Sequence, residues 1–168
     1  MKKLEIELKF PVVNPSALMT KIDGRKPEIM YIKDEVFNKG KMPKVRKRTI
    51  NYSNRVEVSF ERTTPIQGGV MKKVVEEKIT SLPKGYVCKN SYDKIRYAYV
   101  RGDCVITIDF YCFGVFCEIE GNEKVIKEVA KRLGFKLKDN ITKNVDALFC
   151  DWCKKRKIIP PLHWGFSK

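Results

Sequence analysis

The 168-residue sequence predicts an α+β domain built on a closed eight-stranded antiparallel β-barrel, a tunnel with flanking helices. Three observations carry this prediction. Strand patterns separated by short turns fill most of the chain, two segments have helical periodicity, and charged residues alternate with apolar residues along several strands. An even number of antiparallel strands can close without leaving an edge, and eight strands enclose an interior about as wide as one small ligand.

The first strand is predicted at residues 4–10, Leu-Glu-Ile-Glu-Leu-Lys-Phe, because apolar and charged residues alternate there. The alternation places Glu5, Glu7 and Lys9 on one face, with neighbouring side chains about 6.5–7 Å apart. Two adjacent carboxylates repel each other unless a cation lies between them, so the pair indicates a hard divalent metal with oxygen ligands. Lys9 would face an anion beyond the metal. For this strand alone, a charged face in contact with water is the simpler explanation.

Helical signals occur at two places. A short helix is predicted at residues 15–23, with Asn14 as N-cap, Pro15 at its first position and Gly24 after its end. Its buried stripe is predicted to be Ala17, Leu18 and Ile22. A clearer helix is predicted at residues 122–134, with one apolar face, and we expect it to pack outside the barrel so that the interior stays free for charge. The residues of that face are Val125, Ile126, Val129, Ala130 and Leu133.

Seven further strands are predicted, and several repeat the alternation of charge. Their ranges are 29–37, 43–50, 54–62, 70–80, 92–100, 104–111 and 114–121. The charged residues that share a strand face are Lys44, Arg46 and Arg48, then Lys94 and Arg96, then Glu118 and Glu120, with Asp109 in the strand before. Acids thus cluster near both ends of the chain and bases in the middle. A closed barrel that binds a metal and a polyanion explains this segregation, whereas a hydrated outer face does not.

The pattern Glu5-x-Glu7-x-Lys9 resembles the first strand of the CYTH domain, or triphosphate tunnel metalloenzyme, family. The order and spacing of the later motifs also resemble the family, from about residue 3 to residue 149. These motifs are the acidic and aromatic stretch Lys33 to Phe37, Arg46 with Arg48, Lys94 with Arg96 and Tyr97, Asp109, Glu118 with Glu120, Leu133-Gly134, and Ile141 to Asn144. The resemblance implies a tunnel domain at residues 1–149 and a separate basic tail at residues 150–168.

The resemblance also implies an activity, the hydrolysis of a triphosphate group by an enzyme that depends on Mg²⁺ or Mn²⁺. The implied metal ligands are Glu5, Glu7, Asp109, Glu118 and Glu120. The implied substrate-binding residues are Lys9, Arg46, Arg48, Lys94, Arg96 and Lys143. The implied catalytic residues are Glu118 or Glu120, which would activate the attacking water, and Arg48 and Arg96, which would stabilise developing charge. Inorganic triphosphate, a nucleoside or thiamine triphosphate and the triphosphorylated 5′ end of an RNA all stay open as substrates.

Three positions depart from the family pattern. Glu61 stands where the family usually has a lysine, and Arg62 could replace that lysine only through a β-bulge. The usual order of a base and two acids is blurred along residues 70–80, where the inward set is predicted to be Lys72, Glu76 and Lys78. Val145 stands where a tyrosine is common. Two alternatives therefore stay open: a class IV adenylyl cyclase that forms cyclic AMP from ATP, and a nucleotide- or polyphosphate-binding module without turnover.

Composition sets further expectations. Lys and Arg number 35 against 20 Asp and Glu, a net charge of +15, so the surface should attract anions. No apolar stretch reaches the roughly 18 residues of a membrane span, and acids replace the apolar part of a signal peptide, so we expect a cytoplasmic protein. The six cysteines are expected to be free thiols, and Cys104, Cys112 and Cys117, which lie on or beside predicted strands, are expected to be small apolar fillers. The six cysteines are Cys88, Cys104, Cys112, Cys117, Cys150 and Cys153.

Two interpretations of the tail stay open. Basic residues 154–157, together with Trp152 and Trp164, could contact RNA, because cations bind phosphates and aromatic rings stack on bases. Alternatively, one of the two tryptophans docks on the barrel. Cys150 and Cys153 have the spacing of a zinc motif, but His163 would supply only a third ligand, so free thiols are the preferred interpretation.

Overall fold

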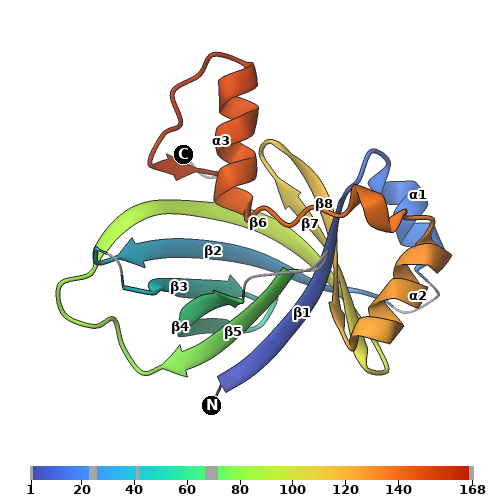
Figure 1. Cartoon of the computed structure of the whole chain (residues 1–168), viewed down its shortest axis with the longest axis horizontal. Helices are drawn as coiled ribbons and strands as arrows, with labels where there is room; N and C mark the ends of the chain where they lie inside the picture. Colours follow the sequence, from blue (N-terminus) through green and yellow to red (C-terminus); the bar gives the residue numbers. More distant parts are fainter. Residues whose placement is uncertain (1, 23–25, 41, 67–71, 167–168) are drawn as a thin grey trace.

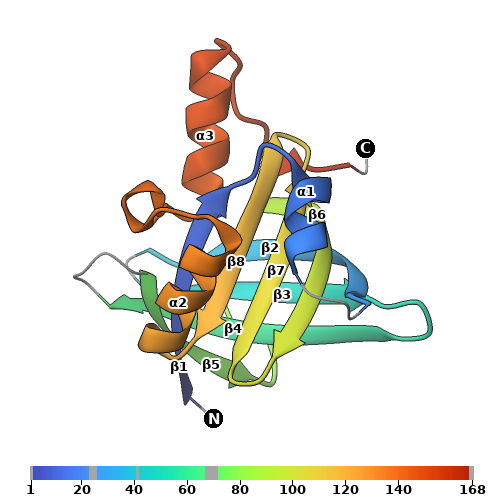
Figure 2. The same cartoon turned by 90° about the vertical axis from the view of Figure 1, so that its right-hand side faces the viewer.

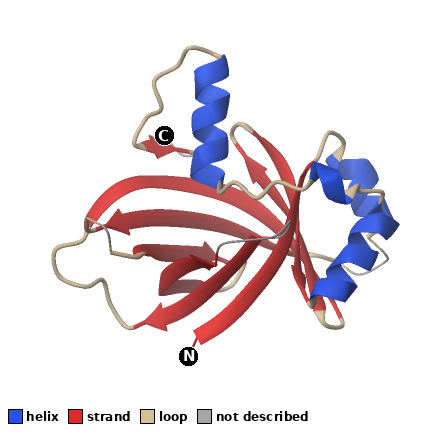
Figure 3. Cartoon of the chain, viewed as in Figure 1, coloured by secondary structure: helices blue, strands red, loops and turns tan. Residues whose placement is uncertain are grey.

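The computed structural model describes residues 2–22, 26–40, 42–66 and 72–166 of the chain. Figure 3 shows a barrel of strands with the helices outside it. The elements in chain order are β1 (Lys2–Pro11), α1 (Pro15–Lys21), β2 (Glu28–Asn38), β3 (Lys44–Asn51), β4 (Val56–Ile66), β5 (Lys72–Ile79), β6 (Val87–Arg101), β7 (Cys104–Tyr111), β8 (Gly114–Gly121), α2 (Glu123–Leu133), the 3-10 turn η1 (Leu137–Asp139), α3 (Val145–Lys155) and β9 (His163–Trp164).

The first eight strands form a closed antiparallel barrel, as the sequence predicted. They are ordered β2-β3-β4-β5-β1-β8-β7-β6, and β6 pairs with β2 to close the ring. Closure gives every one of these strands two neighbours and so leaves no open edge. The order places β1 between β5 and β8, with Glu7 opposite Glu120 and Lys9 opposite Glu118. Acids from the two ends of the sequence therefore meet on one wall (Figure 1).

The main apolar core lies between the barrel wall and helices α1 and α2, and a second cluster, which includes Val36, Tyr92 and Trp164, lies where the C-terminal segment meets the barrel. On β1, Leu8 and Phe10 are fully buried and face the main core, while the alternate residues face the interior. Helices α1 and α2 cover the outside of the wall made by β1, β8 and β7 (Figure 2). Because this main core lies outside the barrel wall, much of the interior is available to charged side chains.

Both predicted helices are present. In α1, the Asn14 side chain accepts a hydrogen bond from the Ala17 amide, and Pro15 is in the first turn. The predicted buried stripe is wrong at Ala17, which is exposed in that first turn, whereas Leu18 and Ile22 are buried. The predicted end at Gly24 lies outside the described residues. In α2, four of the five predicted apolar positions are buried, namely Ile126, Val129, Ala130 and Leu133.

The C-terminal segment packs on the barrel. Helix α3 runs across residues 149 and 150, where the sequence analysis placed the start of a separate tail. Strand β9 pairs in parallel with β6, beside the part of β6 that β7 does not reach. Trp164 is buried there and stacks on Phe149 and Tyr92, with ring centroids 4.2 and 4.6 Å apart. The docked tryptophan is therefore the interpretation that the fold supports, and Figure 1 shows the C-terminal segment beside the barrel.

All six cysteines are free thiols, as predicted. Cys104 and Cys117 are buried apolar fillers, but Cys112 is exposed because it lies in the turn between β7 and β8. Along the described part of the chain, every helix is too short or too polar to cross a membrane.

Candidate functional site

A cavity of about 120 Å³ occupies the barrel interior. Among the described residues its charged lining consists of five acids and five bases. They are Glu5, Glu7, Glu76, Glu118 and Glu120, and Lys9, Arg46, Arg48, Lys94 and Arg96. Nine of these ten residues are the metal- and phosphate-binding candidates of the sequence analysis. Glu76 is the tenth, and it belonged to the inward set predicted for β5.

Strand alternation determines which charges enter the cavity. On β3, Arg46 and Arg48 line the interior, while Lys47 between them faces outward and binds Glu35 with an Nζ to Oε2 distance of 2.7 Å. The register between β3 and β4 is continuous through Glu61 and Arg62. Since β4 has no bulge there, Arg62 does not enter the interior and instead pairs with Glu77. The condition for Arg62 to replace the family lysine, a β-bulge at this point, is therefore not met.

Carboxylates gather on one side of the cavity. Glu5 and Glu7 come from β1, and Glu76 and Glu120 come from the strands on either side of it. Burial, together with the charges of Glu76, Glu120 and Glu7, raises the pKa of Glu5 from 4.5 to about 8, although Arg46 lowers it. These acids therefore repel one another more strongly than the nearby guanidinium compensates.

Arginines on the opposite wall are held by carboxylates of their own. The Arg48 guanidinium donates to both oxygens of Asp34 at 2.8 and 3.0 Å. Arg46 donates to Glu61 at 2.6 and 3.1 Å and to Glu76 at 2.9 Å. Burial alone would raise the pKa of Asp34, but Arg48 and Arg46 lower it well below its usual range. Both arginines are thereby fixed in place as charged donors.

A second fixed group lies on β6, β7 and β8. Arg96 and Lys94 both donate to the fully buried carboxylate of Asp109, with Lys94 Nζ 2.6 Å from Oδ2 and Arg96 Nε 2.6 Å from Oδ1. Arg96 also donates to Glu118 at 2.8 Å, and Lys9 lies 3.0 Å from the same carboxylate. Burial and the neighbouring Arg96 lower the pKa of Lys94 to about 8, although Asp109 raises it.

Two predicted site residues have a different environment from the one that the resemblance implied. Lys143 lies at the surface, outside the cavity lining, and pairs with Asp151 at 2.6 Å. Asp109, implied as a metal ligand, accepts hydrogen bonds from Lys94 and Arg96 on both of its oxygens. Its geometry is that of an anchor for these two cations.

Sequence reasoning missed several residues that shape the site. Asp34 and Glu61 lie behind Arg48 and Arg46, and Tyr92 and Tyr111 line the cavity. Alternation along β2 places Asp34 on the face of the buried Ile32 and Val36, which is a signal that could have found it. The same alternation places Tyr92, two residues before Lys94, and Tyr111, two residues after Asp109, on the inner faces of β6 and β7, so it could have found both tyrosines.

The acidic side fits a divalent metal in the kind and charge of its donors. Mg²⁺ and Mn²⁺ prefer carboxylate oxygens, and the raised pKa of Glu5 reflects acids that a cation would relieve. Within the described ranges no three His, Cys, Asp or Glu side chains already form a closed metal centre. A metal held by Glu5, Glu7 and Glu120 would therefore draw these side chains together.

Comparison with known proteins identifies the fold. No family model and no curated protein matches the sequence. The PH1012 protein from Pyrococcus horikoshii OT3 has a TM-score of 0.67 and 23% identity, covering 86% of this chain and 98% of that chain. The PH1819 protein from the same organism has a TM-score of 0.71 and 17% identity, covering 88% and 98%.

The RNA triphosphatase domain of a mimivirus mRNA capping enzyme is also similar. Its TM-score is 0.55 and its identity 14%, and the match covers 77% of this chain and 88% of that chain. At these identities the likeness concerns the fold. The closed barrel, its charged interior and these likenesses together show that the chain has the fold of the triphosphate tunnel, or CYTH-type, proteins.

Proposed function

We propose that the protein is a phosphohydrolase that removes the terminal phosphate of a triphosphate group inside the barrel, with Mg²⁺ or Mn²⁺ as cofactor. The observation that carries the proposal is the origin of the interior charges: four of the five lining acids, Glu5, Glu7, Glu76 and Glu120, come from the adjacent strands β5, β1 and β8, whereas four of the five bases, Arg46, Arg48, Lys94 and Arg96, come from β3 and β6. Such a division suits a ligand that joins cations to a row of phosphates. A generic hydrated interior gives no reason for it.

The charge balance supports the metal. Behind the five acids of the lining lie three more buried acids, Asp34, Glu61 and Asp109, so eight carboxylates face five cations among the described residues of the tunnel. A triphosphate brings further negative charge into this acidic interior. Because burying uncompensated charge is costly, the substrate would enter together with divalent cations.

In this proposal the basic residues of the interior bind the phosphates. Arg48 and Arg96, each held by a carboxylate, would bind the phosphate oxygens and stabilise the charge that develops on them. Lys9 and Lys94 would bind the same row of phosphates, and Arg46 would do so in competition with Glu61.

The carboxylate of Glu120 would take the proton of the attacking water. It lies opposite Glu7 in the register of β1 and β8, on the acidic side, whereas Glu118 lies opposite Lys9. The water oxygen forms a bond to the terminal phosphorus, the bridging P–O bond breaks, and the shortened phosphate chain leaves. A metal held by Glu5, Glu7 and Glu120 would supply a Lewis acid for the phosphate oxygens.

A phosphate-release assay tests the proposal. The substrates are tripolyphosphate, ATP, thiamine triphosphate and a triphosphorylated RNA, each with Mg²⁺ or Mn²⁺, and the products are identified. We expect orthophosphate from at least one substrate, and a loss of about 10²–10³ in kcat for Arg48→Lys, which keeps the charge near Asp34 but loses the planar fork. The matched control is Lys47→Gln on the outer face of the same strand, which should keep full activity.

Other products would overturn hydrolysis. Pyrophosphate with cyclic AMP from ATP would identify a cyclase, and tight metal-dependent binding without any product would identify a binding module. Full activity of Arg48→Lys, or equal losses in the two β3 variants, would remove the interior arginines from the mechanism.

A further inference from the structure

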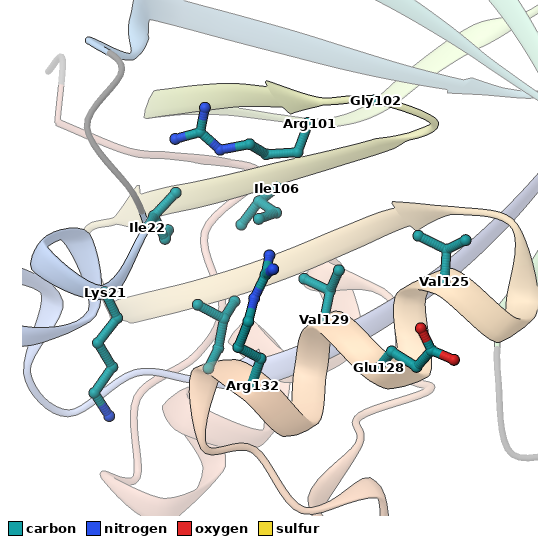
Figure 4. A pocket seen from close by; sticks show the side chains of 10 residues that line it. Lys21, Ile22, Arg101, Gly102, Ile106, Val125, Glu128, Val129 and Arg132 are labelled. Carbon is teal, nitrogen blue, oxygen red and sulfur yellow. The ribbon is translucent and has the colours of Figure 1, made fainter.

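A second and larger hollow lies outside the barrel, between α1, α2 and the hairpin that joins β6 to β7. Its volume is about 940 Å³, within the size range of small-molecule sites. Strand β7 contributes Ile106 to this groove and Asp109 to the tunnel group, so a single strand separates the two sites. Figure 4 shows the groove and the side chains that line it.

Two arginines from different elements enter the groove. Arg101 is the last residue of β6, and Arg132 is in the last turn of α2. In Figure 4 their side chains approach the groove from opposite sides, with Ile106 between the two elements. Glu128 is the one acid of the described lining, and its carboxylate extends away from both guanidinium groups. The groove therefore presents positive charge that its own acid does not neutralise.

Lys21 lines the groove, but in Figure 4 its ammonium group points away from the two arginines. Its Nζ lies 3.5 Å from the position that a Cβ on Gly134 would occupy, at the C-terminal end of α2. A cation there interacts favourably with the negative end of the helix dipole. The two arginines are thus the donors that remain for a ligand.

Arg101 has a donor that the fold does not use. Its Nη2 atom is buried and has no hydrogen-bond partner in the part of the chain that the structure describes. Leaving a buried donor unpaired costs about 1–3 kcal/mol. An acceptor that enters the groove would recover this cost if the guanidinium group moves to meet it, because Nη2 itself is buried.

Apolar side chains form the wall beneath the arginines. Ile22 comes from the end of α1, Ile106 from β7, and Val129 from α2. All three are nine-tenths or more buried, so water approaches the arginines from the open side only. Guanidinium groups bind phosphate and carboxylate more strongly where solvent is partly excluded.

We propose that this groove is a binding site for a small organic anion, separate from the tunnel. A phosphate or carboxylate of the ligand lies between Arg101 and Arg132, and its apolar body lies along the wall of Ile22, Ile106 and Val129. The proposal does not depend on hydrolysis in the tunnel, because no residue of the groove lines that cavity.

Titration calorimetry without metal or triphosphate tests the site with four probes. Octyl phosphate and octanoate carry the anion and the apolar body, octan-1-ol carries only the body, and inorganic phosphate only the anion. We expect octyl phosphate or octanoate to bind at least about 10-fold more tightly than octan-1-ol and inorganic phosphate, since a charge-assisted pair of contacts exceeds the 1.4 kcal/mol that a factor of ten requires. If octyl phosphate binds more tightly than octanoate, the anionic group of the ligand is a phosphate. If octanoate binds more tightly, it is a carboxylate.

Variants locate the binding. Arg132→Gln, at an exposed position, and Arg101→Gln should each weaken octyl phosphate about 10-fold, with Arg101→Lys as a version that keeps the charge and the fold. Arg156→Gln, whose guanidinium lies over the Trp152 ring, is the matched control and should leave affinity unchanged. Equal affinity in wild type and both groove variants would overturn the site. If octan-1-ol binds as tightly as octyl phosphate and octanoate, the arginines have no role in binding. If inorganic phosphate binds as tightly as they do, the apolar wall has none.

Discussion

Glu5 makes the tunnel's need for a cation measurable in the protein without metal. Its pKa is raised from 4.5 to about 8 by burial and by Glu76, Glu120 and Glu7. Between these two pH values the folded protein retains a proton that the unfolded chain has released. The stability contributed by this group is therefore present below pH 4.5 and is lost as the pH rises toward 8.

We predict that Glu5→Gln removes this loss. The metal-free variant should be more stable than wild type at pH 9, on the order of 2 kcal/mol in the free energy of unfolding, and should differ little from it at pH 5. Urea unfolding in EDTA at pH 5, 7 and 9 measures the difference. Glu77→Gln on the outer face of β5 is the control, and a pH dependence that is the same in Glu5→Gln and wild type would contradict the assignment.

We predict that Glu61 sets how strongly the tunnel binds a triphosphate. It is 8% exposed, and its carboxylate occupies two donor positions of Arg46. A neutral amide would hold the guanidinium less firmly and remove one negative charge from the interior. Glu61→Gln should therefore lower the KM for tripolyphosphate about 10-fold, the effect of one charge-assisted contact.

Steady-state kinetics with saturating Mn²⁺ measure this change. Glu57→Gln is the matched control, because Glu57 lies on the same strand but is exposed and paired with Arg55. An unchanged or higher KM in Glu61→Gln would show that Glu61 does not restrain Arg46 against the substrate.

At the scale of elements, the C-terminal segment supports the tunnel wall. Tyr92 and Tyr111 line the cavity from β6 and β7, and Trp164 of β9 contacts both rings from outside. The backbone amide of Phe166 donates to the buried carboxylate of Asp93 at 2.7 Å and fixes the end of the segment. The segment is thereby part of the barrel's packing.

Trp164→Ala should destabilise the protein by about 3–5 kcal/mol, the usual effect of removing a buried tryptophan. Activity on all triphosphates should fall in parallel, because the inner tyrosines lose their support. Thermal unfolding and phosphate release check both effects, with Ile159→Ala as control since that side chain is 88% exposed. A selective loss on triphosphorylated RNA, with stability intact, would instead favour a tail that guides RNA.

In the whole molecule, the described tunnel residues carry a net negative charge, whereas the chain as a whole carries a net positive charge. The chain carries +15 in total, while the described tunnel residues include eight carboxylates and five cations. The positive excess therefore lies outside the tunnel, where it attracts anions over a distance of about one Debye length, ~8–10 Å. We therefore expect an anion to enter the tunnel together with cations.

This difference predicts that metal and triphosphate stabilise the fold together. Tripolyphosphate alone should shift the melting temperature little, whereas Mn²⁺ with tripolyphosphate at 100 times the dissociation constant should add about 2.7 kcal/mol. Differential scanning fluorimetry over a matrix of both ligands measures the coupling. Strong stabilisation by tripolyphosphate in EDTA would contradict an acidic interior.

The eight strands and two of the helices follow from local patterns, because period-two and period-3.6 alternation are properties of short segments. The same alternation put nine charged residues correctly on the inner wall. The paired charges of β1 and of β8 determined the acidic side in this way. Local pattern is sufficient wherever a side chain's direction depends only on its own strand.

Tertiary structure alone decided which charge meets which. Arg46 and Arg48 are held by Glu61 and Asp34 because the strand registers place each arginine directly opposite its carboxylate on a neighbouring strand, and Lys143 lies outside because it precedes a helix that leaves the barrel. The docking of Trp164 and the groove of Arg101 and Arg132 join segments that are far apart in the chain. Such contacts depend on the closed topology, which no local pattern contains.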